Sequence, residues 1–137
     1  MTTYIQRHST KFAKRSCASA SVSPTTADLA WAAGFLEGEG TFSPVTVTLK
    51  NGERKRYARV AAYQTTDEPL NRLQRMFGGS IFRHTYAARG LAKGYQRKPA
   101  ATWTVNGARA RGVMFTLWTF LSGRRQEQVR LALNGGY

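Results

Sequence analysis

Two periods of hydrophobic and polar residues alternate along this chain of 137 residues, one typical of helices and one typical of strands. Residues 27–40 carry apolar positions at helical spacing, and Thr26 is the expected N-cap. From Thr41 the period changes to two, which predicts a half-buried strand up to the hairpin signal Asn51-Gly52. A second, antiparallel strand is expected to end at Gln64. The pattern therefore predicts a helix followed by a hairpin.

The same succession is expected to follow once more. Residues 67–77 predict an amphipathic helix that Gly78-Gly79 ends, and residues 80–87 and 101–105 predict two antiparallel strands. Residues 108–121 and 124–133 predict two further helices. Consecutive hairpins can form one antiparallel sheet whose helices cover a single face. The sequence therefore predicts an α+β fold with one sheet face left open.

The first predicted helix carries a stripe of very small residues. Ala30, Gly34 and Gly38 fall at i, i+4 and i+8 on one face. Glycine costs about 1 kcal/mol relative to alanine inside a helix, so a close approach of another backbone is the expected reason for two glycines. Crossing two such helices at their ends would set the carboxylates of Glu37 and Glu39 side by side. The alternatives are ordinary core packing of the stripe and a solvated acidic helix end.

The composition indicates a folded protein that binds a polyanion. The chain has 21 Lys and Arg against 7 Asp and Glu, a net charge of +14, which favours nucleic acid over a membrane surface. A ribosomal-type or histone-like basic protein is the alternative, but 3 Trp, 6 Tyr and 7 Phe indicate a folded domain that bears a site. One Cys and two His exclude an intramolecular disulfide and a zinc cluster, so any metal must have oxygen ligands.

The domain is expected to span residues 27–134, after a basic arm. Residues 1–26 contain four Lys and Arg, no acid and many small residues, and they predict a disordered arm. The same composition resembles an organellar transit peptide, and an extension of no specific role is a further alternative. The apolar stretches are far shorter than the roughly 20 residues that span a bilayer, so a soluble protein without a membrane partner is expected.

Four segments in order resemble the LAGLIDADG homing endonucleases. Residues 32–40, AAGFLEGEG, are similar to the family signature, with Phe for the first Leu of the inner pair, Glu for both Asp and Gly for the inner Ala. The similarity continues in residues 41–42, in residues 77–81 (FGGSI) and in residues 120–128 (FLSGRRQEQ). The order of elements resembles the αββαββα plan of that family. Glu in place of Asp reaches one methylene further, and the N-terminal arm has no counterpart in the minimal family plan.

This resemblance implies a site-specific double-strand DNA endonuclease. A single copy of the motif implies a homodimer on a long, near-palindromic duplex, held together through Ala30, Gly34 and Gly38. Glu39 is implied as a catalytic residue and as the ligand of Mg²⁺ or Mn²⁺, contributed once by each subunit. Glu37 is implied to be structural and to bind a turn.

The resemblance also implies two further catalytic positions, for which there are three candidate residues. Gln64 stands in the place of a polar residue that positions water near the metal, although it could be a simple amide at a strand end. Arg124 or Arg125 stands in the place of a basic residue near the scissile phosphate. We prefer Arg125, because alignment from Gln126 selects it, whereas alignment from Phe120 selects Arg124.

In the family the concave sheet face lies in the DNA major groove, whose edges distinguish all four base pairs. Alternation then predicts base contacts from Thr46, Thr48, Tyr57, Arg59, Ala61, Tyr63, Arg83 and Thr85. Residues expected nearer the phosphates, or in a basic loop between the last two strands, are Lys50, Arg54, Arg56, Arg89, Lys93, Arg97 and Lys98. A shift of one residue near Pro44 would exchange the two faces there.

Two other functions fit the same composition. A relative that has lost cleavage and binds DNA or RNA, as an intron maturase or a regulator, would keep the basic sheet face. A small basic RNA-binding structural protein would require the glutamates to be incidental. The protein is expected in whichever compartment holds its DNA, a bacterial or phage cytoplasm or an organelle.

Overall fold

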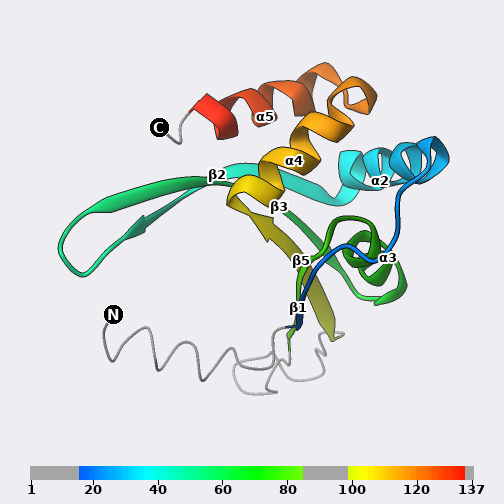
Figure 1. Ribbon diagram of the computed structural model, residues 1–137, viewed down its shortest axis with the longest axis horizontal. Coiled ribbons are helices and arrows are strands. Elements are labelled where there is room, and N and C mark those ends of the chain that lie inside the picture. The colour runs from blue at the N-terminus through cyan, green and yellow to red at the C-terminus, as the bar shows by residue number, and fades with distance from the viewer. Residues whose placement is uncertain (1–15, 85–98, 135–137) are drawn as a thin grey trace, which may run out of the picture.

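The protein was analysed as a computed structural model that describes residues 16–84 and 99–134 (Figure 1). Its elements are β1 (Ser16–Ala18), α2 (Thr26–Glu39), β2 (Gly40–Thr48), β3 (Arg54–Gln64), α3 (Glu68–Phe77), β4 (Gly79–His84), β5 (Ala100–Asn106), α4 (Gly107–Leu117), η1 (Trp118–Phe120) and α5 (Gly123–Asn134). The predicted order of elements is confirmed from α2 onward. The helix predicted over residues 108–121 stops at Leu117 and continues as the short 3-10 turn η1.

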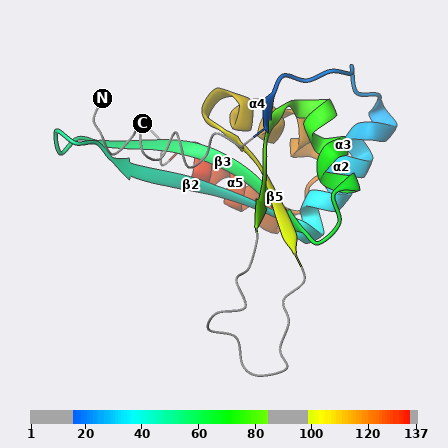
Figure 2. The same cartoon turned by 90° about the horizontal axis from the view of Figure 1, so that it is seen from below.

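The strands form one sheet in the order β1-β4-β5-β3-β2, and every neighbouring pair is antiparallel. The helices lie together on one side of this sheet, as both views show (Figures 1 and 2). The β2–β3 hairpin projects well beyond the helices (Figure 2). The fold is therefore α+β with one open sheet face, as predicted.

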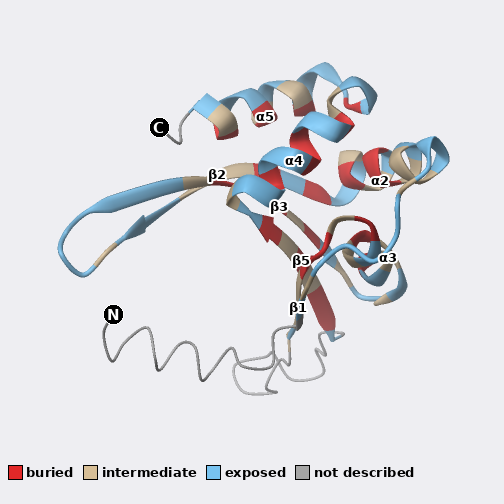
Figure 3. Ribbon diagram, viewed as in Figure 1, coloured by how far each residue is buried: buried red, intermediate tan, exposed pale blue. Residues whose placement is uncertain are grey.

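The core lies between the sheet and the helices (Figure 3). Ala58, Val60 and Ala62 of β3 are buried, whereas the residues between them are partly exposed, so the strand buries one face only. Trp103 of β5 is fully buried, and its indole nitrogen donates to the carbonyl oxygen of Gly78 at 2.8 Å. Because that donor is satisfied, a large aromatic side chain can fill the centre of the sheet at no polar cost.

Residues 16–26, which belong to the predicted N-terminal arm, include a strand and the start of α2. Residues 16–18 form β1 on the free edge of β4, where they pair with the edge strand's unsatisfied backbone groups. The backbone amide of Ser21 then donates to the Arg75 carbonyl at 2.8 Å. Thr25, not Thr26, caps α2 in a reciprocal capping box with Asp28. Residues 1–15 of the predicted arm lie outside the described residues.

Two glycines make the sharp passage from α3 to β4 possible. Gly78 and Gly79 both have a positive φ, +72° and +99°. A Cβ at Gly78 would lie 2.5 Å from the carbonyl oxygen of Ala18, and one at Gly79 would lie 2.5 Å from that of Thr104. Both obstacles are backbone atoms, which cannot move aside as a flexible side chain could. Only glycine therefore fits at these two positions without strain.

Replacing Gly79 by alanine should lower the free energy of unfolding by about 2 kcal/mol or more, because the new Cβ meets a backbone oxygen in a positive-φ conformation. Gly112→Ala is the matched control, since that helical glycine has open space around it and should gain up to about 1 kcal/mol. Urea unfolding of both variants measures the difference. Equal stability of the two variants would contradict this account of the passage.

Candidate functional site

The end of α2 is fastened to the start of α5 through Glu37. Its carboxylate accepts hydrogen bonds from the backbone amide of Ser122 at 2.7 Å and from the Ser122 hydroxyl at 2.9 Å. The Ser122 hydroxyl in turn accepts from the amide of Arg125 at 3.3 Å, as an N-cap side chain does. The bond from the Ser122 amide is the main reason why the pKa of Glu37 lies below its ordinary value. The structural role predicted for Glu37 is confirmed.

Arg125 completes this connection from the other side. Its side chain is 9% exposed, and its Nε and Nη2 donate to the carbonyl oxygen of Glu37 at 3.0 and 2.8 Å. Its Nη1 donates to Gln128 at 2.9 Å. The Glu37 carbonyl belongs to the last turn of α2, whose oxygens have no partner inside the helix. We call these contacts of Glu37, Ser122 and Arg125 the α2–α5 clasp.

The clasp changes the choice between the two arginines. All three nitrogens of the Arg125 guanidinium have partners within the chain, so this side chain is used by the fold. Arg124 precedes it in the first turn of α5 and is exposed. The geometry therefore favours Arg124 over our preferred Arg125 as the cation available to a phosphate, and the alignment from Phe120 selects the same residue.

Glu39 is the last residue of α2 and its side chain is exposed. The negative end of a helix dipole disfavours a carboxylate, and the last turn of α2 contains no basic residue to offset it. None of the ion pairs between residues that the structure describes involves Glu39. The carboxylate of Glu39 therefore stands where an added cation would be stabilising.

Gly40 fixes how closely Glu39 approaches the sheet. A Cβ on Gly40 would lie 2.6 Å from the carbonyl oxygen of Leu36, so the direct turn from α2 into β2 requires glycine. Gly40 pairs with Ala62 of β3, and Gln64 follows two residues later at the end of that strand. The register thus brings Glu39 and Gln64 to the same end of the sheet. Gln64 is half-buried and shares the alternation of Ala62.

On β3 the predicted outward residues Tyr57, Arg59, Ala61 and Tyr63 alternate with buried ones, but on β2 the open face differs from the prediction by one residue. Phe42 of β2 is buried and pairs with the buried Val60, so odd-numbered residues face outward on both strands. Thr46 and Thr48 share the face of Phe42, and their predicted place on the open face is wrong. Outward-facing pairs of the hairpin are Thr41–Ala61, Ser43–Arg59, Val45–Tyr57 and Val47–Lys55. Arg54 and Arg56 pair with Thr48 and Thr46, and Lys50 lies exposed at the hairpin turn.

Arg83 is also on the other face. It pairs with Ala101, which is buried, and its guanidinium forms an ion pair with Asp67 at the start of α3. The neighbouring Arg83 guanidinium holds the pKa of Asp67 below its ordinary value. Arg83 therefore connects β4 to α3, and the prediction that it lies on the open face is wrong. The other predicted contacts in this region lie outside the described residues: Thr85, Arg89, Lys93, Arg97 and Lys98.

An aromatic and hydroxyl cluster on the open face was missed by the sequence reasoning. His84 Nε2 lies 2.7 Å from the hydroxyl of Thr102, and its ring centroid lies 4.9 Å from that of Phe82 and 5.9 Å from that of Tyr63. Only Tyr63 had been predicted. The burial of Trp103 would have been the signal, because alternation around it places Thr102 on the outward face.

None of the residues that the structure describes packs on the small-residue stripe of α2. Ala30, Gly34 and Gly38 are all exposed, and a Cβ at either glycine would meet nothing within 4 Å. Ordinary core packing, the alternative interpretation, therefore does not account for these glycines in the described part of the chain. The face is open to another molecule.

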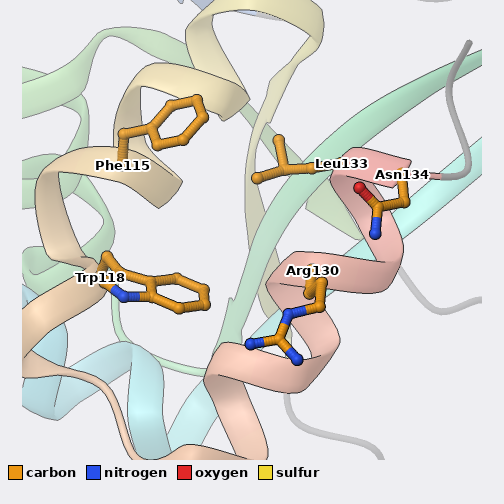
Figure 4. A pocket seen from close by; sticks show the side chains of 5 residues that line it. All are labelled: Phe115, Trp118, Arg130, Leu133 and Asn134. Carbon is orange, nitrogen blue, oxygen red and sulfur yellow. The ribbon is translucent and has the colours of Figure 1, made fainter.

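A pocket of about 220 Å³ lies elsewhere, between α4, η1 and α5 (Figure 4). Phe115, Trp118 and Leu133 give it apolar walls, and Arg130 and Asn134 lie at its rim. No strand of the open face contributes to it. Within residues 16–84 and 99–134, no group of three or more Asp, Glu, His or Cys side chains is arranged to hold a metal ion. No helix in the same ranges is long and apolar enough to cross a bilayer.

Comparison with solved structures identifies the fold. The chain resembles homing endonuclease I-CvuI in complex with a DNA target in the presence of Mg, with 18% identity and a TM-score of 0.60 over 80% of this chain and 68% of that one. It also resembles the group I intron-encoded homing endonuclease I-CeuI complexed with DNA, with 15% identity and a TM-score of 0.57 over 93% of this chain and 59% of that one. I-TnaI, another homing endonuclease, has a TM-score of 0.51 at 15% identity, over 80% of this chain and 69% of that one.

The fold of the chain is thus the one seen in these homing endonucleases. This agrees with the resemblance to the LAGLIDADG family in residues 32–40. No family profile and no curated protein matches the sequence.

Glu37→Gln should lower the free energy of unfolding near neutral pH, because the carboxylate is the acceptor of the clasp. The folded-state pKa of Glu37 is lowered, so its stabilisation is present above its ordinary pKa and is lost as pH falls through the folded-state pKa. The stability difference between the two proteins should therefore shrink in acid. Urea unfolding of both proteins, repeated at steps of about one pH unit between pH 3 and 7, measures this stability difference.

Glu127→Gln is the control for the same experiment at neutral pH. That carboxylate is 56% exposed and pairs with Arg130 one turn away, so its loss should cost only about 0.3–0.5 kcal/mol. Equal losses from the two substitutions would argue against a clasp at Glu37.

Proposed function

We propose that this protein is a site-specific double-strand DNA endonuclease that acts as a homodimer with a divalent metal ion on a near-palindromic target. The observation that carries the proposal is the position of Glu39, an exposed and uncompensated carboxylate where α2 meets the open sheet of a homing endonuclease fold. A net charge of +14 supports a polyanionic substrate.

The donor set at Glu39 fits a hard divalent cation such as Mg²⁺ or Mn²⁺. Carboxylate, phosphate and water oxygens are the ligands that Mg²⁺ prefers, and one carboxylate with several waters is common for this ion. Glu39 of each copy would hold the metal together with phosphate oxygens of the DNA. When bound, the metal would neutralise developing charge on the phosphate and make water a better nucleophile. In support, I-CvuI was crystallised with DNA in the presence of Mg and of Ca.

Two other residues complete the proposed site. Gln64 ends the strand that lies beside the α2–β2 turn, and its amide can orient a water molecule through both its donor and its acceptor. Arg124, exposed at the start of α5, would neutralise the scissile phosphate. Arg125 would serve by fixing α5 to the α2 end. Water activation and charge neutralisation are what phosphodiester hydrolysis needs from a protein.

The open face provides a surface for the major groove. Strand residues rise about 3.4 Å each, close to the rise per base pair of a duplex, so outward residues two apart can address alternate base pairs. The projecting hairpin carries Lys55, Tyr57 and Arg59 outward, with further basic residues at its tip. Such a surface suits a nucleic acid better than an apolar partner.

Glu39→Gln should abolish cutting while leaving DNA affinity within about threefold, because the amide keeps the shape of the side chain but removes the charge that binds the metal. The test is incubation of both proteins with a randomised duplex library and Mg²⁺, followed by sequencing of the cut ends and a gel-shift measurement of binding. Glu53→Gln, an exposed hairpin-loop carboxylate, is the control and should cut normally. Cutting by Glu39→Gln would place the metal elsewhere. Binding by the natural protein without cutting in Mg²⁺ or Mn²⁺ would favour a cleavage-inactive DNA- or RNA-binding relative.

Gly34→Leu should prevent dimer formation, because the proposed seam requires the α2 helices of two copies to approach at their small residues. Gly112→Leu is the matched control, since it is also an exposed helical glycine with open space around it. Sedimentation equilibrium, with circular dichroism to confirm folding, should show a monomer for Gly34→Leu and a dimer for the control. A dimer in both variants would mean that the seam lies elsewhere.

A further inference from the structure

Asn106 occupies a helix-capping position but does not cap. It is the N-cap residue of α4, where an asparagine side chain ordinarily accepts from a backbone amide of the first turn. Its side chain makes no such bond here. Its Oδ1 accepts from Nε of Arg59 at 2.8 Å instead. Forgoing a cap destabilises a helix, so the bond to Arg59 needs a reason other than helix stability.

The bond holds Arg59 in the middle of the open face. Arg59 and Asn106 are direct cross-strand partners on β3 and β5, and both point outward. The Arg59 guanidinium carbon lies 6.0 Å from the centroid of the Tyr57 ring, which supports it from the same strand. Because the acceptor engages Nε–H, the two terminal amino groups form the end of the side chain that a ligand on this face would meet.

We propose that the Arg59–Asn106 pair reads one guanine in each half of the DNA target. Arg59 would donate from its terminal amino groups to O6 and N7 of guanine, the donor geometry that a planar guanidinium matches best. Asn106 is the positioning residue, because it fixes the guanidinium before DNA arrives and so lowers the entropy lost on binding. This inference rests on the proposed DNA-binding function but not on cleavage.

The strand register gives the approximate place of that guanine. Arg59 lies three residues before Ala62, the partner of Gly40, which directly follows Glu39. Three strand residues span about 10 Å, or about three base pairs of duplex. The guanine should therefore lie roughly three base pairs farther from the target centre than the bases nearest Glu39.

The alternative is that the bond serves only to join β3 to β5. A cross-strand pair of that kind stabilises a sheet modestly and carries no base preference. If the bond had only this role, Asn106→Ala would lower the stability of the protein, or its affinity for every DNA sequence, by the same amount. A positioning role predicts a loss confined to one base pair per half-site.

The test is selection of bound duplexes from a randomised library in Ca²⁺, with Asn106→Ala, Asn106→Asp and Arg59→Lys beside the natural protein. Asn106→Ala and Arg59→Lys should each reduce the preference for guanine about tenfold at one position per half-site and leave the other positions and the salt dependence unchanged. Asn106→Asp keeps an acceptor for Nε and should restore the preference. Asn71→Ala, an exposed asparagine on α3, is the control and should select the natural site.

A guanine preference that survives Asn106→Ala, or one that weakens equally at every position, would overturn the proposal while leaving DNA recognition intact. If the natural protein enriches no sequence, the proposed function fails and this inference fails with it. Thermal unfolding of each variant, measured in parallel, identifies any uniform loss that arises from the fold.

Discussion

The α2–α5 clasp is the interaction on which the arrangement of the candidate site depends. It satisfies the last carbonyls of one helix with the arginine of another, and it places the Glu37 carboxylate at the positive end of α5. Both helix ends are thereby fixed relative to the sheet. Glu39 follows Glu37 by two residues and Arg124 follows Ser122 by two, so one set of hydrogen bonds orients both the carboxylate and the cation. The two neighbouring acids thus differ, because Glu37 is paired with Arg125 whereas none of the ion pairs among the described residues involves Glu39.

A similar difference between buried and exposed polar groups separates the two sides of the sheet. On the helical side Trp103 and the α3–β4 passage have their polar groups paired within the chain. On the outward side the cations and hydroxyls of the hairpin and of β5 are exposed or half-exposed, and the small-residue stripe of α2 has open space above it. A chain with a charge of +14 that keeps these surfaces uncovered is built to meet another macromolecule. In the proposed assembly DNA covers the sheet and a second copy covers the stripe.

The order of elements and the open face could be predicted from the sequence, because local periodicity and turn residues determine them.

The faces of individual strand residues were harder to predict. The apolar side chains of Val45 and Val47 favour the buried side of β2, but the hairpin projects beyond the helices, and neither residue is buried. Phe42, nearer the helices, sets the register instead, and this moved Thr46 and Thr48 to the other face. The ion pair of Arg83 could not be predicted because its partner Asp67 lies on another element, and the place of Arg125 in the clasp could not be predicted because its acceptor is a backbone carbonyl. Such contacts between distant segments leave no local pattern.

The central claim is that two copies of Glu39 converge on a divalent metal above the DNA. Anomalous diffraction from crystals of the protein bound to its selected duplex and soaked with Mn²⁺ tests it directly. The account predicts anomalous density in contact with the Glu39 carboxylates of both protomers, at about 2.0–2.2 Å from their oxygens. Density at another set of acids, or Glu39 side chains that lie far from each other and from any phosphate, would contradict it.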